Sequence, residues 1–127
     1  MKRILVVEDE KSIREFEVIN LNRVGYKTVE AANGEEALTA LKTPGARPFD
    51  AVLTDLWMPG MDGEALLRAI RADPALAGLP VVALTADVEY RAKYAEIGFD
   101  GLLLKPVTLG ELAKVLDEVL APARPKA

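Results

Sequence analysis

The chain has 127 residues, the length of a single domain, and half of them are hydrophobic, which is too many for a disordered protein. Acidic residues outnumber lysine and arginine by 20 to 16, so a general nucleic-acid-binding surface is not expected. Because cysteine and histidine are absent, disulfides, thiolate or imidazole metal sites and catalysis by either side chain are excluded, and any chemistry must use carboxylates, lysine, hydroxyl groups or a hard metal ion.

Short apolar runs alternate along the chain with longer segments of helical period, as in βα units built around a parallel sheet. Three of the runs contain a continuously apolar stretch, at 4–7, 81–84 and 102–104, which is typical of strands that are covered on both faces. In chain order, strands are predicted at residues 3–7, 28–31, 51–54, 81–85 and 101–104.

Three helices are predicted between the first four strands. The first covers residues 11–24, and one polar residue, Asn20, falls on its apolar face without an evident reason. That apolar face is formed by Ile13, Phe16, Leu21 and Val24. The second helix begins at a capping box at Asn33, and the third runs from a cap at Asp62 to the helix-stopping pair 73–74.

A fourth helix is predicted after the fourth strand, with Tyr90, Tyr94 and Ile97 at helical spacing. A different set of residues can supply its buried face: Val88, Ala92 and Ala95. We therefore hypothesise that part of the aromatic side is a partner surface, which requires that the two tyrosines are not both fully buried. The fifth helix has the clearest pattern, from a capping box at Thr108 through residues 109–120.

Strict alternation of five strands and five helices fits few folds at this length. A (β/α)₈ barrel needs about twice as many residues. We therefore predict an α/β fold with a flavodoxin-like, doubly wound, five-stranded parallel sheet in the order 2-1-3-4-5. Residues 1–121 are expected to form this domain, and residues 122–127 a disordered tail.

Charged and hydroxyl side chains stand at four of the strand ends, where ligands bind in such a sheet. Glu8 and Asp9 follow the first strand, Asp55 the third and Lys105 the fifth, while Thr85 ends the fourth. Carboxylates held close together repel one another unless a cation shares them. Because only oxygen ligands are available, we predict a Mg²⁺ site, with Mn²⁺ or Ca²⁺ as alternatives.

A carboxylate beside a divalent cation can also attack phosphorus and form an aspartyl-phosphate. The transition state of phosphoryl transfer spreads negative charge over oxygens, which Lys105 and Thr85 are equipped to bind. These residues therefore favour phosphoryl acceptance at Asp55. Each has an ordinary structural explanation by itself, such as a turn, a strand-end hydroxyl or a solvated lysine, and only their joint occurrence indicates a functional site.

At these positions the sequence resembles the receiver domains of two-component response regulators, in particular single-domain chemotaxis regulators. The resemblance extends over residues 2–120. The segments that carry it, in the expected order, are Val6-Val7-Glu8-Asp9-Glu10, Asp55-Leu56-Trp57-Met58-Pro59-Gly60-Met61-Asp62-Gly63, Ala83-Leu84-Thr85-Ala86 and Leu104-Lys105-Pro106.

The resemblance implies roles for individual residues at the acidic strand ends. Asp55 is expected to be the phosphoryl acceptor. Mg²⁺ is expected to be bound by Asp9, Asp55 and the backbone carbonyl of Trp57, with Glu8 in its outer shell.

Further roles are implied around the phosphoryl group. Thr85 and Lys105 are expected to contact its oxygens, and the peptide bond between Lys105 and Pro106 to be cis. Trp57 and Asp87, which lie two residues after the acceptor and two after the hydroxyl, are expected to tune how long the phosphoryl group survives.

One position departs from the family pattern. The family's switch pairs the hydroxyl at Thr85 with an aromatic ring three residues before the lysine, and here that position is Leu102. We expect phosphorylation to be preserved while its coupling to the output surface is altered.

The resemblance also implies partners and a place of action. The phosphoryl group is expected from a sensor histidine kinase or a histidine phosphotransfer protein, and the chain is expected to catalyse only its own phosphorylation and dephosphorylation. The face formed by the fourth and fifth strands and the helices after them is expected to switch and to bind an unidentified downstream protein. The molecule is expected to be a monomer or a phosphorylation-induced dimer without contact to nucleic acid or membrane.

A cytoplasmic location is expected. The longest run without a charge, 74–86, is too short for a membrane span, and acidic residues interrupt the first apolar run too early for a signal peptide.

Other functions remain as alternatives. A Mg²⁺-dependent phosphatase of the haloacid-dehalogenase type has a second aspartate two residues after its nucleophile, where this chain has Trp57. A flavin or dinucleotide carrier needs a phosphate-binding loop after the first strand, and three acids at 8–10 would repel a phosphate. A degenerate receiver would serve as a phosphorylation-independent binding module.

Overall fold

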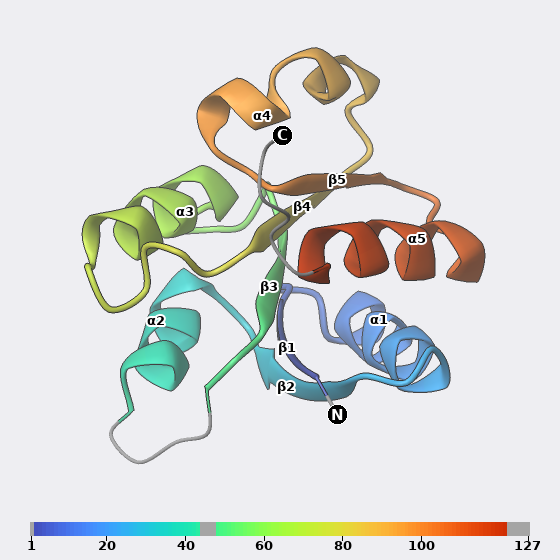
Figure 1. Ribbon diagram of the computed structural model, residues 1–127, viewed down its shortest axis with the longest axis horizontal. Helices are drawn as coiled ribbons and strands as arrows, with labels where there is room; N and C mark the ends of the chain where they lie inside the picture. The colour runs from blue at the N-terminus through green and yellow to red at the C-terminus, as the bar shows by residue number, and fades with distance from the viewer. Residues whose placement is uncertain (1, 44–47, 122–127) are drawn as a thin grey trace.

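The computed structural model describes residues 2–43 and 48–121, and the predicted tail at 122–127 lies outside them. Parallel strands form one sheet in the predicted order β2-β1-β3-β4-β5 (Figure 1). The strands are β1 (Arg3–Val7), β2 (Lys27–Ala31), β3 (Ala51–Asp55), β4 (Val81–Thr85) and β5 (Gly101–Leu104). The predicted flavodoxin-like arrangement is confirmed.

The register of the sheet brings the carboxyl ends of its strands to one edge. Val7 at the end of β1 lies beside Thr54 of β3, and Thr85 at the end of β4 lies beside Leu104 of β5. Side chains that end or follow these strands therefore emerge next to one another.

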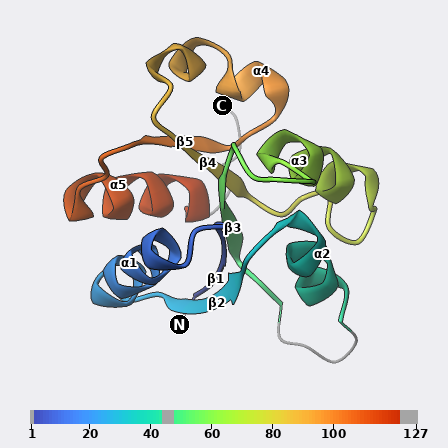
Figure 2. The ribbon, with the colours of Figure 1, turned by 180° about the vertical axis from the view of Figure 1, so that it is seen from behind.

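Helices cover both faces of the sheet. On one face lie α1 (Lys11–Arg23) and α5 (Leu109–Leu120), and on the other lie α2 (Gly34–Lys42) and α3 (Gly63–Ala72), as Figure 1 and the reverse view in Figure 2 show. Among the described residues, no helix has the length and apolar character needed to cross a membrane.

The predicted capping residues start α2, α3 and α5. Each cap side chain accepts a hydrogen bond from the backbone N–H three residues later, at 2.8 Å for Asn33, 2.8 Å for Asp62 and 3.1 Å for Thr108. These bonds satisfy donors that a helix leaves unpaired in its first turn, which is why local sequence alone located these helix starts.

The fourth helical segment is broken in two, whereas a single helix was predicted. A 3₁₀ turn, η1 (Val88–Ala92), precedes one α-helical turn, α4 (Tyr94–Ile97). The backbone of Lys93 between them has φ of −131°, which is outside the helical range and interrupts the hydrogen-bond ladder.

Tyr90 anchors this segment in the α2/α3 layer. Its ring lies edge-on to Phe99 with centroids 6.1 Å apart, and its side chain is only 3% exposed. The alternative buried face is wrong, because the structure exposes all three of its members: Val88, Ala92 and Ala95. Tyr94 is half-buried, so a partner surface on this side stays a prediction.

Helix α1 presents a different face to the sheet from the one predicted. Leu21 is buried as expected, and Ile13 and Val24 are half-buried, but Phe16 is 61% exposed. Glu17, one turn before Leu21, is buried instead. The placement of Phe16 on the buried face is therefore wrong: the helix is rotated so that a carboxylate occupies an inward position.

Two apolar layers result, because successive strand residues point to opposite faces of the sheet. The α2/α3 layer includes Leu5, Val7, Val52, Leu66, Leu67, Ile70, Tyr90 and Phe99. The α1/α5 layer includes Ile4, Val6, Leu21, Leu53, Val82, Leu84, Leu103, Leu112 and Leu116. The edge with the carboxyl ends of the strands lies between the two layers.

Candidate functional site

Three carboxylates meet at the carboxyl edge of the sheet. Glu8 and Asp9 follow β1, Asp55 ends β3, and one oxygen from each lies within 4.8 Å of the others. Glu8 and Asp55 are buried, whereas Asp9 is exposed. The structure thus brings together the three acids that the sequence pattern selected, with an opening toward solvent on the Asp9 side.

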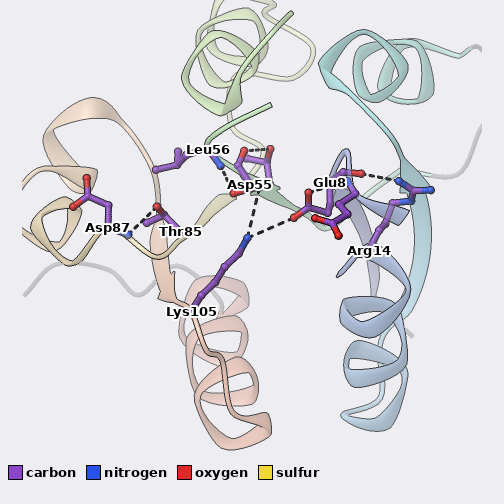
Figure 3. A network of polar contacts seen from close by, with 9 residues as sticks. Glu8, Arg14, Asp55, Leu56, Thr85, Asp87 and Lys105 are labelled. Atoms are coloured by element: carbon purple, nitrogen blue, oxygen red, sulfur yellow. Dashed lines mark hydrogen bonds and ion pairs between the residues drawn. The ribbon is translucent and has the colours of Figure 1, made fainter. Parts of the chain in front are cut away.

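Lys105 lies between two of these acids. Its ammonium nitrogen is 3.6 Å from Glu8 Oε1 and 3.6 Å from Asp55 Oδ2 (Figure 3). The backbone N–H of Lys105 donates to the carbonyl of Thr85 at 2.8 Å, which ties the end of β5 to the end of β4. The peptide bond to Pro106 is cis, as expected.

Asp55 is held by its own strand and by the loop after it. Its Oδ1 accepts a hydrogen bond from the Leu56 backbone N–H at 2.9 Å, and its carbonyl accepts one from the Thr54 hydroxyl at 2.9 Å. A Cβ on Gly63 would lie 2.5 Å from that carbonyl, so only glycine fits this close approach of α3. One carboxylate oxygen is therefore fixed by the backbone, and the other faces Lys105.

Glu8 is almost fully buried, with 1% of its surface exposed. Burial raises the pKa of Glu8 to about 7, against the lowering effect of the Glu10 backbone N–H, which donates to its Oε2 at 3.1 Å. The neighbouring Asp55 raises this pKa further, and Lys105 lowers it. Glu8 Oε1 has no hydrogen-bond partner among the described residues and lies 3.6 Å from the ammonium nitrogen of Lys105.

Thr85 is buried beside the cluster at the end of β4. Its hydroxyl oxygen accepts a hydrogen bond from the Asp87 backbone N–H at 3.1 Å. Asp87 in turn caps η1 by accepting from the Glu89 backbone N–H at 3.0 Å. The hydroxyl is therefore linked directly to the segment that continues into η1.

Arg14 is a site residue that the sequence analysis missed. Its Nη1 donates to the backbone carbonyl of Glu8 at 2.7 Å (Figure 3). Its Nε pairs with Glu30 at 3.1 Å. The side chain is only 14% exposed, so this contact fixes the end of β1 against β2 and α1. The sequence feature that could have indicated this role is an arginine in the first turn of the helix that directly follows the acids.

Two predicted lifetime-tuning residues, Trp57 and Asp87, and the predicted switch residue, Leu102, surround the cluster without joining it. Trp57, two residues after Asp55, is 66% exposed. Asp87 is half-buried, and Leu102 is half-buried against the α2/α3 layer. No residue of this group contacts the carboxylates in any hydrogen bond or ion pair of the described residues.

The comparisons with known proteins decide the family. A model of the response regulator receiver domain matches residues 4–117. The chain belongs to the receiver domain family. Receiver domains of two-component systems are signalling modules rather than conventional enzymes, and they interact with histidine kinases and downstream targets.

Relatives of this receiver include both short and long proteins. It is 37% identical over 119 residues to the chemotaxis protein CheY-3 of Vibrio cholerae, covering 92% of this chain and 90% of that protein. It is 38% identical over 113 residues to the probable transcriptional regulator ycf27 of Cyanophora paradoxa, where it covers 87% of this chain and 45% of the relative. The chain thus spans about half the length of the ycf27 proteins.

Solved structures agree with the receiver fold. The Vibrio cholerae chemotaxis protein CheY4 aligns with a TM-score of 0.83 at 34% identity, covering 94% of this chain and 99% of that one. A putative response regulator from Chloroflexus aurantiacus aligns with a TM-score of 0.85 at 33% identity, covering 95% and 98%.

The residues of this receiver suit the Mg²⁺ that receiver domains bind at an acidic pocket. The cluster offers oxygen ligands from Glu8, Asp9 and Asp55, and one buried oxygen of Glu8 lacks a hydrogen bond. Hard divalent cations take such carboxylate oxygens, and Mg²⁺ keeps several waters, for which the exposed Asp9 side leaves access.

Proposed function

We propose that this receiver accepts a phosphoryl group on Asp55 from a histidine kinase or a histidine phosphotransfer protein, in a Mg²⁺-dependent reaction, and that this modification switches the face formed by α4, β5 and α5. The observation that supports it best is the position of Asp55, whose Oδ2 faces Lys105 at 3.6 Å within a cluster of three carboxylates.

In the proposed reaction, a carboxylate oxygen of Asp55 attacks phosphorus while the bond from phosphorus to the donor's nitrogen breaks, and the electron pair of that bond leaves with the donor. Bound Mg²⁺, held by Asp9, Asp55 and the Trp57 carbonyl with Glu8 in its outer shell, would neutralise charge on the phosphoryl oxygens. Lys105 binds the same developing charge as a mobile cation.

Thr85 is proposed to connect the phosphoryl group to the switching face. The modification adds about −1.5 to −2 charges near Asp55. The Thr85 hydroxyl then donates to a phosphoryl oxygen, and its bond from the Asp87 N–H couples that movement to η1. Leu102 is already half-buried, so we expect it to move less than a polar aromatic side chain would.

Intact-mass spectrometry with acetyl phosphate tests the acceptor directly. The wild-type protein should gain one phosphoryl group only when Mg²⁺ is present, and Asp55→Asn should gain none. Asp73→Asn is a matched control, because it removes a carboxylate at the C-terminus of α3, away from the cluster, and should be modified like the wild type.

A donor restricted to its own kinase could leave acetyl phosphate inactive, and beryllofluoride covers that case as a mimic of the bound phosphoryl group. Amide NMR shifts at residues of the acidic edge and of α4, β5 and α5 should follow its addition with Mg²⁺. If neither reagent affects the wild-type protein, the proposal is wrong and a phosphorylation-independent binding module replaces it.

A further inference from the structure

A cavity of about 290 Å³, partly open to solvent, lies in the α1/α5 layer, between α1 and the segment that joins β5 to α5. Its walls are mainly apolar and include Phe16, Leu84, Leu103, Val107 and Leu112. A cavity of about 150 Å³ is enough to bind benzene in another protein, so this one has room for a single ring with a short substituent.

The wall of this cavity contains a buried carboxylate that nothing in the structure satisfies. Glu17 is 9% exposed, and neither of its oxygens has a hydrogen-bond partner among the described residues. A buried charged or polar group without a partner is costly, and proteins that retain one in their interior usually pair it. Asn20, one turn later on α1, also lines the cavity and adds an amide to the same wall.

Lys105 and Arg14 lower the pKa of Glu17 through their charges, but they form their ion pairs elsewhere. Lys105 lines the cavity, but its ammonium group forms its ion pairs with Glu8 and Asp55. Arg14 pairs with Glu30 and with the carbonyl of Glu8. Burial raises the pKa of Glu17 to about 8, and the charge of Glu8 raises it further.

We propose that this cavity is a binding site for a small primary amine with an apolar body, whose ammonium group pairs with the Glu17 carboxylate. The apolar walls bind the body of the ligand, and the single acidic side chain selects its charge. Asn20 accepts a further hydrogen bond from the ammonium group through its amide oxygen. The occupant lies beside Lys105, the side chain that also pairs with Asp55.

Charge complementarity supports an amine over the other occupants of an apolar cavity. An apolar molecule would fill the space and leave Glu17 unpaired, and an anion would meet a like charge wherever Glu17 is ionised. A charge-assisted hydrogen bond between an ammonium group and a carboxylate is about twice as strong as a neutral one.

Two ligands of the same shape test the proposal: benzylamine, which is a cation, and benzyl alcohol, which is neutral. Amide NMR titrations at about pH 8, where the carboxyl of Glu17 is about half ionised, give both dissociation constants. We expect benzylamine to bind the wild-type protein about tenfold more tightly. Shifts should concentrate in α1 and in residues 103–112.

Two variants locate the charge that selects the amine. Glu17→Gln keeps the shape of the side chain and should abolish the preference, so that benzylamine and benzyl alcohol bind with about equal dissociation constants. Glu15→Gln is the matched control: Glu15 lies on the same helix, is exposed and pairs with Lys11 at 3.9 Å, so its loss should leave the preference intact.

Equal binding of the two ligands to the wild-type protein, or shifts outside the cavity, would overturn the proposal and leave the space to a neutral apolar occupant. A preference that survives in Glu17→Gln would overturn it as well. The wild-type comparison needs no variant to fold. Because neither phosphodonor nor Mg²⁺ is present, the result is independent of whether Asp55 accepts a phosphoryl group.

Discussion

The α2/α3 layer and the α1/α5 layer each enclose an oxygen-bearing side chain, and the two side chains differ in whether they have a hydrogen-bond partner. In the α2/α3 layer the Tyr90 hydroxyl donates to Glu64 Oε2 at 2.6 Å, and its ring packs against Phe99. In the α1/α5 layer Glu17 has no partner among the described residues and borders a cavity. Burial of a polar group therefore stabilises one face of this sheet and costs stability on the other.

The largest expected effect comes from truncating one leucine in each layer. Leu66→Ala in α3 should destabilise the protein by about 4 kcal/mol, because truncating this fully buried side chain leaves an empty space in the core. Leu112→Ala in α5 should cost about 2 kcal/mol, because Leu112 already borders the existing cavity. Urea denaturation of both variants measures the difference, and equal costs would contradict the contrast between the layers.

The next effect concerns Glu17 and pH. Its native pKa of about 8 lies above the ordinary value of 4.5, so the native state keeps its proton after the unfolded state has lost it. The unfavourable contribution of Glu17 therefore grows as pH rises from 4.5 to 8 and is complete above 8.

Glu17→Gln removes this contribution. Relative to the wild type, the variant should gain about 4 kcal/mol of stability between pH 5 and pH 9. Chemical denaturation at both pH values measures the change. Glu8, whose pKa is also raised, is present in both proteins, and the measured difference includes its charge repulsion with Glu17. A pH-independent difference would show that Glu17 is not buried as a carboxyl group.

A smaller effect is expected from the satisfied polar group of the other layer. Tyr90→Phe should cost about 1.5 kcal/mol, because it removes a hydrogen bond to the Glu64 carboxylate and keeps the packing of the ring. Glu64→Gln provides the paired measurement in a double-mutant cycle. A neutral effect of Tyr90→Phe would mean that the hydroxyl gains nothing over its bonds to water.

The smallest expected effect lies at the edge between the two layers. Asp9→Asn should stabilise the metal-free protein by about 1 kcal/mol, because it removes one of three adjacent carboxylates. It should also reduce the rise in melting temperature that Mg²⁺ causes. Thermal melts with and without Mg²⁺ measure both. If the metal stabilises wild type and variant equally, the metal site is misplaced.

Some features of the site followed from sequence because they are local. Glu8, Asp9, Asp55 and Lys105 stand at strand ends, and parallel strands with this order must bring those ends to one edge. The caps at Asn33, Asp62 and Thr108 were likewise readable, since the bond that each makes spans three residues.

Other features depended on which elements pack together. Arg14 reaches the Glu8 carbonyl and Glu30 of β2, a partner 16 residues away, and periodicity within α1 contains no information on that contact. The rotation that exposes Phe16 and buries Glu17 is likewise set by how α1 meets the sheet and α5.

The sequence by itself determined the alternation of elements, the strand order and the chemistry available at the acidic edge, because these follow from residue types and short-range patterns. Tertiary structure alone decided that Glu8 is buried and has a raised pKa, that Lys105 lies between Glu8 and Asp55, and that Glu17 borders a cavity. The physical reason is that desolvation and Coulomb interactions depend on distances between groups far apart in the chain, which only packing sets.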